Sequence, residues 1–388
     1  MDITQQGLIA LMKSALTGKS QPLPEAFSLT ELHPLISSHH INAQIYQGAV
    51  LCGISRSEPV MQQLFRDYCK ALLRSEGQVE AFTTISRAFE ENGIDYLPLK
   101  GCKLKALYPK PELRTMSDAD ILIRLEQRPQ IQQIMEALGF QEKKETDHEW
   151  VWTNRQLFVE LHKHLIPSYN EDFYAYFGKG WQLAVNRDGH CYSMRIEDEM
   201  LFLFTHFTKH YRDGGIGCRY VADLWMYLQA HPELDMDYLE VELRKMRLWE
   251  FFCNIRQLIN VWFEDGQSDE KIDFITDVIF ASGSWGKKED RTISVGVREK
   301  GKSGAIRSKM VYLRKIAFPN TNMLKSKYTV LQKAPWLLPA VWLYRPFYKV
   351  AKERKSLMRH QDMLQKLTPE NLQTRQDALN YVGLDYHL

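Results

Sequence analysis

Long apolar runs and paired cysteine motifs are both missing from this 388-residue chain. No apolar segment reaches the roughly 20 residues that a membrane-spanning helix needs. Residues 1–18 lack the basic head and the clean apolar run of a signal peptide. The six cysteines are scattered and form no C-x-x-C pair, which argues against a structural zinc site or a disulfide framework. We therefore expect a cytoplasmic protein.

The chain also has almost no net charge, +2 at pH 7, but its charges are unevenly distributed. Residues 287–359 contain 19 Lys or Arg against 4 Asp or Glu, a net of +15, and the rest of the chain carries −13. Such a block indicates an anionic partner, either RNA or a membrane surface, or else a face that docks on the acidic part. Residues 335–347, apolar and followed by basic residues, fit an interfacial membrane anchor or a lid.

Helical periodicity dominates the rest of the chain. Apolar residues recur at three- and four-residue steps over residues 59–92, which predicts one long amphipathic helix that ends at Asn92-Gly93. Helical patterns also fill the region before it and most of the chain after residue 172. Strand patterns occur between these regions, at residues 94–99, 118–123, 140–144, 149–153 and 156–162. Pro98 places the first of them at a sheet edge or marks a strand end.

Two carboxylates begin the second predicted strand. Asp118 and Asp120 are two residues apart, so in a strand both project from the same face. The residues between and after them are apolar on both faces of the strand, which predicts that the strand is buried. Burying two like charges is costly unless a cation lies between them. Paired acids of this kind suit Mg²⁺, which takes hard oxygen ligands and shares them with substrate phosphates.

A third acid lies in the last predicted strand. Glu160 shares one face of that strand with His162, and its direct neighbours are apolar. A glutamate in such a position is more often paired or metal-bound than unpartnered. His162 fits an orienting or a structural role.

The ordered set of Leu99-Lys100-Gly101, Arg114, Asp118-x-Asp120 and Glu160-Leu161-His162 resembles the uncharacterised nucleotidyltransferase family of bacteria, a branch of the polymerase-beta-like nucleotidyltransferase superfamily. The resemblance covers roughly residues 60–235. It implies an α+β fold, with a small mixed β-sheet nucleotidyltransferase core embedded in a mostly helical chain. It also implies Mg²⁺- or Mn²⁺-dependent transfer of an NMP group from an NTP, most simply ATP, to an acceptor that the sequence does not identify.

The resemblance assigns residues to this reaction. Asp118, Asp120 and Glu160 become the catalytic, metal-binding acids, and two ions orient the substrates for in-line attack. The nucleotide-binding candidates surround the glycine turn and precede the acid pair: Lys100, Gly101, Cys102, Lys103, Arg114 and Ser117. Arg114 is interpreted either as a triphosphate clamp or as a partner of Asp118 or Asp120. Cys102 departs from the superfamily, which often has a serine at this position. Since a thiol is a poor hydrogen-bond donor, Cys102 is less suited than serine to bind a phosphate.

A second interpretation keeps the fold without the reaction: a catalytically inactive nucleotidyltransferase-fold binding or assembly module, associated with RNA or peripherally with a membrane through its basic C-terminal region. Under either interpretation we expect four regions. They are a helical region at 1–92, the nucleotidyltransferase core at 93–168, a helical domain at 169–282 and a basic helical region at 283–388. Within the third, Arg219 and Asp223 are spaced for an i, i+4 ion pair.

Overall fold

The computed structural model describes residues 1–168, 170–284 and 286. Beyond these it describes residues 290, 293–294, 297, 309–310, 313–314, 317–318, 324, 328, 330–352, 358, 361 and 363–384. The chain forms two compact units, Met1–Lys209 with Ile216–Trp285, and His210–Gly215 with Gly286–Leu388. The expected division into four regions stays a prediction.

Four helices precede the first strand. They are α1 (Ile3–Thr17), α2 (His33–Ser38), α3 (Asn42–Leu51) and α4 (Pro59–Glu91). The long helix predicted at residues 59–92 is confirmed as α4. It begins with Pro59, whose missing N–H is not needed in a first turn. It ends at Asn92, and Gly93 follows with φ +68°, a conformation in which glycine carries no steric penalty.

Seven strands form one mixed sheet in the order β3-β4-β5-β2-β1-β7-β6. The predicted strands are confirmed as β1 (Tyr96–Leu99), β2 (Asp118–Ile123), β3 (Gln141–Glu145), β4 (Glu149–Thr153) and β5 (Phe158–His162). The hairpin of β6 (Ala184–Asp188) and β7 (Cys191–Met194) was not expected, because helix was predicted after residue 172. An α+β fold is therefore confirmed, with its sheet larger than the sequence indicated.

The edge position inferred from Pro98 is wrong. Strand β1 lies inside the sheet, antiparallel to β2 on one side and parallel to β7 on the other. The pairing with β7 involves only Tyr96 and Cys191, so Pro98 lies beyond it, one residue before the strand ends. A missing backbone N–H is tolerated at such a position.

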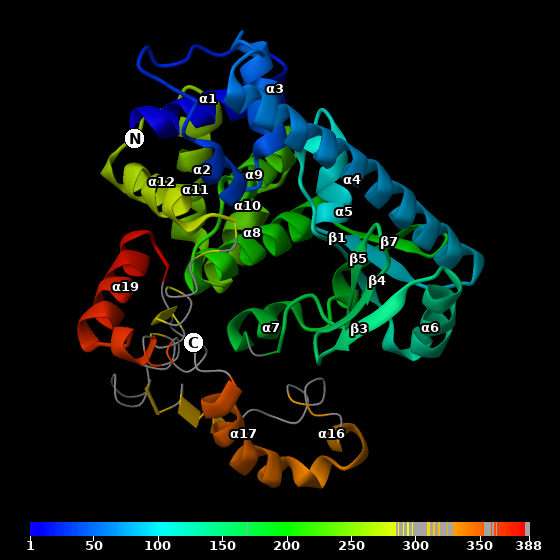
Figure 1. The fold of residues 1–388 in the computed structure, drawn as a ribbon. Helices are drawn as coiled ribbons and strands as arrows, with labels where there is room; N and C mark the ends of the chain where they lie inside the picture. The colour runs from blue at the N-terminus through cyan, green and yellow to red at the C-terminus, as the bar shows by residue number, and fades with distance from the viewer. Residues whose placement is uncertain are drawn as a thin grey trace. The chain divides into compact units, whose positions relative to one another are not determined.

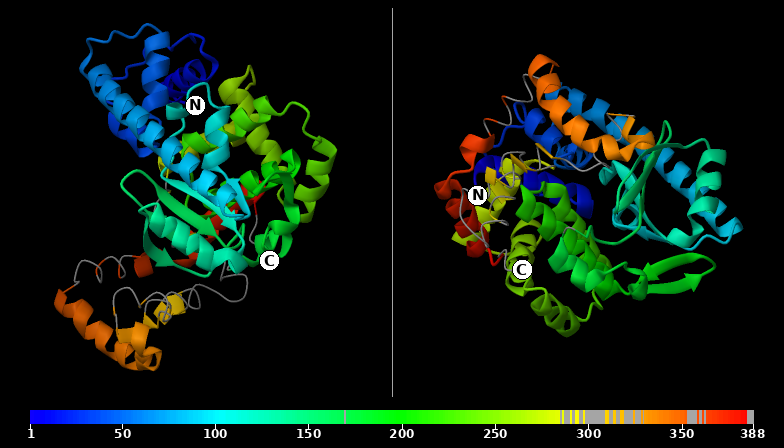
Figure 2. Two further views of the ribbon diagram at one scale, coloured as in Figure 1. Left: turned by 90° about the vertical axis from the view of Figure 1, so that its right-hand side faces the viewer. Right: turned by 90° about the horizontal axis from the view of Figure 1, so that it is seen from below.

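One face of the sheet is covered by α4 and by α6 (Arg128–Ala137), as Figures 1 and 2 show. The core between them contains Ile85 and Phe89 of α4, Ile131 of α6, and Ile121 and Val159 of the sheet. The odd-numbered residues of β2 therefore point into this core. The even-numbered ones, which include Asp118 and Asp120, point away from α4 and α6.

Helices after the core strands make up most of the rest of the chain. A short helix, α5 (Gly101–Leu104), follows β1. The later helices of the first unit are α7 (Glu171–Phe177), α8 (Ile196–Asp213, whose last residues belong to the second unit), α9 (Cys218–Ala230), α10 (Met236–Lys245), α11 (Trp249–Phe263) and α12 (Glu270–Ser282).

The second unit contains α16 (Val330–Lys333), α17 (Leu338–Lys352) and α19 (Pro369–Tyr381). Leu324, Leu331 and Val341 form a small apolar cluster, whereas Trp336 and Leu343 are each 75% exposed. Among the described residues, no helix is both long and apolar enough to cross a membrane. Much of the basic helical region expected at 283–388 lies outside the described residues.

Candidate active site

The parallel pairing of β2 with β5 brings the candidate acids together. Asp120 is the direct partner of Glu160, and Leu122 is the partner of His162. Paired residues on neighbouring strands share a face, so the even-numbered positions of both strands project from the face opposite α4 and α6. Residues 40 positions apart in sequence thus become neighbours.

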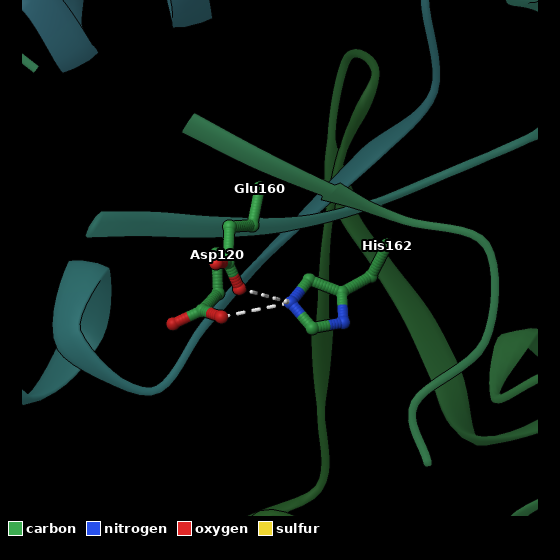
Figure 3. A group of neighbouring side chains, drawn as sticks. All are labelled: Asp120, Glu160 and His162. Atoms are coloured by element: carbon green, nitrogen blue, oxygen red, sulfur yellow. Dashed lines mark hydrogen bonds and ion pairs between the residues drawn. The ribbon is translucent and has the colours of Figure 1, made fainter. Parts of the chain in front are cut away.

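Asp120, Glu160 and His162 form a compact cluster, shown in Figure 3. One potential ligand atom from each lies within 4.8 Å of the others. The His162 Nε2 atom is 2.7 Å from Asp120 Oδ1 and 3.7 Å from Glu160 Oε2. Asp120 and His162 are almost fully buried, whereas the Glu160 side chain is 25% exposed. Glu160 therefore faces the side from which a substrate can approach.

The two carboxylates of this cluster differ in their electrostatics. Burial, followed by the like charges of Asp120 and Asp118, raises the pKa of Glu160 to about 8. Burial acts in the same direction on Asp120. It is outweighed by the Lys100 ammonium and the hydrogen bond to His162, which together hold the pKa of Asp120 below its ordinary value. The cluster thus has one firmly ionised acid beside one that holds a proton near neutral pH.

A second histidine fixes the orientation of His162. His148, directly before β4, places its Nε2 atom 3.1 Å from His162 Nδ1. Burial, together with the neighbouring His162 and Lys100, lowers the pKa of His148 to about 2, so His148 is neutral. When His162 donates its Nε2 proton to Asp120, its Nδ1 accepts from His148. When His162 Nε2 offers its lone pair to a cation, the Nδ1 proton is donated to His148 instead.

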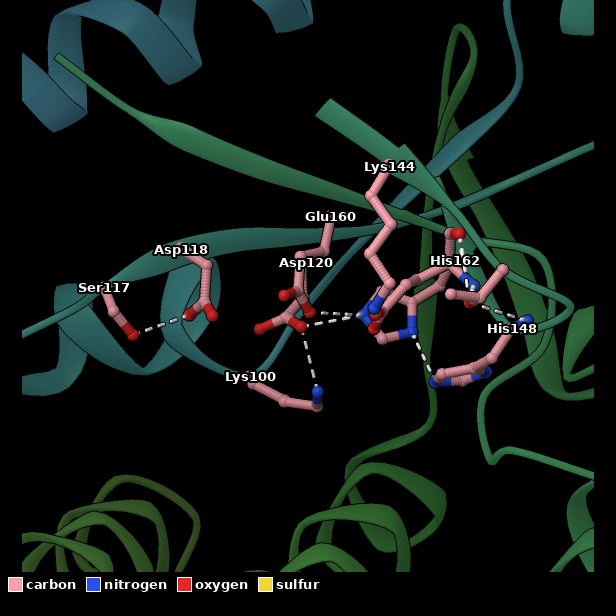
Figure 4. Close-up of polar contacts among 10 residues, drawn as sticks. Lys100, Ser117, Asp118, Asp120, Lys144, His148, Glu160 and His162 are labelled. Atoms are coloured by element: carbon pink, nitrogen blue, oxygen red, sulfur yellow. Dashed lines mark hydrogen bonds and ion pairs between the residues drawn. The ribbon is translucent and has the colours of Figure 1, made fainter. Parts of the chain in front are cut away.

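Lys100 contacts the cluster from the turn after β1. Its Nζ atom donates to Asp120 Oδ1 at 2.9 Å, as Figure 4 shows. The backbone of Lys100 has φ +44°, which is sterically unfavourable for a residue with a Cβ atom. Strain of this kind persists only where the surroundings enforce it, and it is concentrated at functional sites.

Gly101 and Cys102 have packing roles in this turn. A Cβ atom on Gly101 would lie 2.8 Å from Arg114 Nη1 and 2.9 Å from Met116 Sδ, so any other residue there would displace one or both of these side chains. Cys102 packs against the apolar core between the sheet and its covering helices. Burial raises the pKa of its thiol, and the Asp120 charge raises it further, so the thiol stays protonated. Backbone groups are therefore the donors that this turn offers to a ligand.

Two of the basic candidates are paired with acids elsewhere in the first unit. Arg114 makes a bidentate ion pair with Asp223 of α9, with Nε–Oδ1 and Nη2–Oδ2 distances of 2.8 and 2.9 Å. The sequence-based interpretations of Arg114, as a triphosphate clamp or as a partner of Asp118 or Asp120, did not include this ion pair. Asp223 thus pairs with Arg114 and not, as the i, i+4 spacing had suggested, with Arg219. Lys103 forms an ion pair with the buried Glu199 of α8. Of the three basic side chains predicted to bind nucleotide, only Lys100 contacts the carboxylate cluster.

Asp118 lies on the same face of β2 as Asp120, but its carboxylate is turned toward Ser117. The Ser117 hydroxyl donates to Asp118 Oδ1 at 3.1 Å. Burial raises the pKa of Asp118, and the charge of Asp120 adds to this effect. A rotation of the Asp118 side chain would add a third carboxylate to the cluster.

Stability should depend on pH through Glu160. The folded protein keeps a proton on Glu160 up to about pH 8, whereas the unfolded chain releases it near the ordinary value of 4.5. The folded state therefore binds more protons between these values, and its stability falls as pH rises through this window. We expect Glu160→Gln to remove this fall, measured as urea midpoints from pH 5 to 8.5. The exposed Glu142→Gln in β3 should behave as wild type, and equal pH profiles for all three proteins would contradict the assignment.

Sequence reasoning found the acids but underestimated the histidines. His162 is placed on the Glu160 face by its spacing alone, yet its contact with Asp120 depends on the parallel pairing of β2 with β5. His148 was interpreted only as part of a hairpin turn. Its contact arises because Glu149 pairs with His162 across the hairpin, which a single sequence does not reveal.

Comparison with known proteins gives one match. Neither the curated proteins nor the solved structures include a significant match to this chain. The family model described as uncharacterised nucleotidyltransferase matches residues 25–264. This range contains the whole sheet, the Lys100 turn and the cluster of Asp120, Glu160 and His162. The chain therefore belongs to the family of uncharacterised nucleotidyltransferases.

Proposed function

We propose that this protein transfers an NMP group from an NTP to an acceptor in a reaction that depends on a divalent cation. The observation that carries the proposal is the convergence of Asp120, Glu160 and His162 on one buried spot, with Asp118 two residues away on the same strand face. Family membership supports the reaction class. The geometry supports the choice of residues.

The cluster fits a divalent cation. Burial raises the pKa of Glu160 to about 8 together with the like charges of Asp120 and Asp118, and a cation bound there would offset these like charges. Carboxylate oxygens suit Mg²⁺ and Mn²⁺, and an imidazole nitrogen is better suited to Mn²⁺. Asp118, Asp120 and Glu160 would hold the metal, together with His162. When bound, the metal would stabilise the charge that develops on the oxygens of the transferred phosphoryl group.

Residues of the chain would then perform separate tasks. Lys100, at the glycine turn and in contact with Asp120, would neutralise a phosphate oxygen of the nucleotide. A Glu160 carboxylate oxygen would accept the proton of the attacking acceptor group, because Glu160 is more exposed to an incoming substrate than Asp120. His148 would keep the His162 ring in one orientation through its 3.1 Å contact.

A non-catalytic binding module is the second candidate. It is favoured by the ion pairs that the basic candidates already make: Lys100 with Asp120, Lys103 with Glu199 and Arg114 with Asp223. In this interpretation the Lys100 ammonium replaces the metal as the counter-charge of Asp120. The basic residues 287–359 would then contact an anionic partner, either RNA or a membrane surface.

Thermal unfolding with ligands separates the two candidates. For the transferase we expect ATP with Mn²⁺ or Mg²⁺ to raise the unfolding temperature of the wild-type protein. The Asp118→Asn/Asp120→Asn double variant should lose this rise. The exposed Asp188→Asn at the end of β6 is the matched control and should keep it. If the wild-type protein shows no rise with any NTP and either metal, the binding module is the better interpretation.

A further inference from the structure

A second polar pocket lies on the N-terminal side of the acid strand. It has a volume of about 330 Å³ and is formed by α2, α3, α4 and the segment before β2. Four of its lining residues are charged or ionisable, and three are polar: His40, Asp67, Lys70, Arg74, Ser37, Asn42 and Thr115. It is separate from the carboxylate cluster, which contributes none of these residues.

The single acid of this pocket is already neutralised. Asp67 accepts a hydrogen bond from Asn42 at 3.1 Å and contacts the His33 ring at 2.8 Å. Gln63 also donates to it at 3.3 Å, and the Lys70 ammonium lies 3.5 Å away. Burial opposes the charge of Asp67, but these partners outweigh it and hold its pKa below the ordinary value, so Asp67 is ionised and the Lys70 ammonium offsets its charge toward an anion.

Arg74 is the distinctive cation of the pocket. Within the described part of the chain, the structure gives its guanidinium no hydrogen bond and no ion pair, and the residue is exposed. The pKa of His40 is lowered by burial, then by Arg219 and then by Arg74. The pKa of Lys105 is lowered by burial, then by Arg114 and then by Arg74. The Arg74 and Lys105 charges therefore repel each other, whereas the lowered pKa of His40 favours its neutral form. An anion in the pocket would relieve the repulsion and could take the bidentate contact that arginine offers.

The pocket wall is connected to the acid strand. The Thr115 hydroxyl donates to the carbonyl of His40 at 2.8 Å, and Arg219 of α9 donates to the Thr115 carbonyl at 2.5 Å. Arg219 in turn lowers the pKa of Asp118, although burial and Asp120 outweigh this effect. Two residues separate Thr115 from Asp118, so the two Cα atoms are at most about 10 Å apart along the chain. His40 itself has φ +55°, an unfavourable backbone conformation that the surroundings enforce.

We propose that this pocket binds an anionic group, a phosphate by preference, of the acceptor substrate. A triphosphate would bind next to the cations held by Asp118, Asp120 and Glu160. A group held by Arg74 would instead lie in the pocket that Thr115 also lines. An acceptor long enough to extend from the pocket to the cluster would anchor its anion at Arg74 while its nucleophile reaches the carboxylates. The acceptor role rests on the proposed function, whereas the binding of phosphate does not.

Equilibrium dialysis with radiolabelled inorganic phosphate, without metal or nucleotide, tests the pocket. We expect Arg74→Gln to weaken phosphate binding about 10-fold or more, the loss expected for a charge-assisted contact. Arg74→Lys should show a smaller loss. The matched control is Arg87→Gln, an exposed arginine on the same helix that does not line the pocket, and it should bind as wild type. Equal binding by Arg74→Gln and wild type would overturn the proposal.

Two further arms locate the phosphate. The Asp118→Asn/Asp120→Asn variant should bind phosphate as the wild-type protein does. Weaker binding would place the anion near the carboxylate cluster and overturn the proposal that it binds in the pocket. A saturating non-hydrolysable ATP analogue with Mn²⁺ should leave phosphate binding unchanged, and competition would overturn the acceptor role. If the analogue does not bind at all while phosphate still requires Arg74, the proposed function fails and the pocket stands.

Discussion

Replacing Asp120 by asparagine is expected to lower nucleotidyl transfer about 100- to 1,000-fold, the loss typical of removing one preorganised electrostatic group. Asp120 is the ionised acid of the cluster and contacts both Lys100 and His162. Asparagine keeps the shape of the side chain but removes the charge that a metal requires. It also removes the like charge that raises the pKa of Glu160, so the proton balance of the site changes as well.

Transfer can be measured without knowing the acceptor. Radiolabelled ATP, with each other NTP in parallel, is incubated with the protein and a cell extract, and label that moves to another molecule is resolved by electrophoresis and chromatography. The Asp188→Asn control should transfer as wild type does. Unfolding temperatures of all variants establish that they are folded. A folded Asp120→Asn protein with wild-type transfer would remove Asp120 from the reaction.

The second large effect concerns stability. Asp223→Ala is expected to lower the free energy of unfolding by about 3–5 kcal/mol, because it leaves the Arg114 charge buried without its partner. Arg114 and Asp223 are 4% and 6% exposed. The Tyr108 hydroxyl, which donates to Asp223 Oδ1 at 2.7 Å, would lose its acceptor too. Urea unfolding measures the loss.

A double variant distinguishes a buried charge from a general packing defect. Arg114→Met/Asp223→Ala removes both charges and should recover part of the lost stability, since exchanging a whole buried ion pair for apolar groups is often nearly neutral. The exposed Asp188→Ala should stay within about 0.5 kcal/mol of wild type. If the double variant is less stable than Asp223→Ala, the unpaired Arg114 charge is not the cause.

Local sequence patterns were sufficient for the elements that carry the acids. Spacing alone places Asp118 and Asp120 on one face of their strand, and the same rule places Glu160 and His162 on one face of theirs. The long helix α4 follows from its apolar period, from Pro59 and from Gly93. These features depend on residues a few positions apart, which is the range over which one sequence is informative.

Long-range pairing was not predictable. Nothing in the sequence selects Asp223, 109 residues away, as the partner of Arg114. The β6–β7 hairpin was missed because its first strand is mostly exposed and polar, without the alternation that reveals a half-buried strand. Of the two positions inferred from Pro98, the strand end is confirmed, and the sheet edge is wrong because the sequence does not show the short contact with β7.

The order of strands has a consequence for how the protein acquires its chemistry. Strands β3, β4 and β5 form a local meander, and β1 and β2 are near neighbours in the chain. The two groups join only through the parallel contact of β2 with β5, and non-local pairing of this kind closes slowly. A partly folded or newly synthesised chain with both groups formed but not joined would hold Asp120 and Glu160 apart. If the proposed function holds, competence to bind a metal would then arise when β2 pairs with β5.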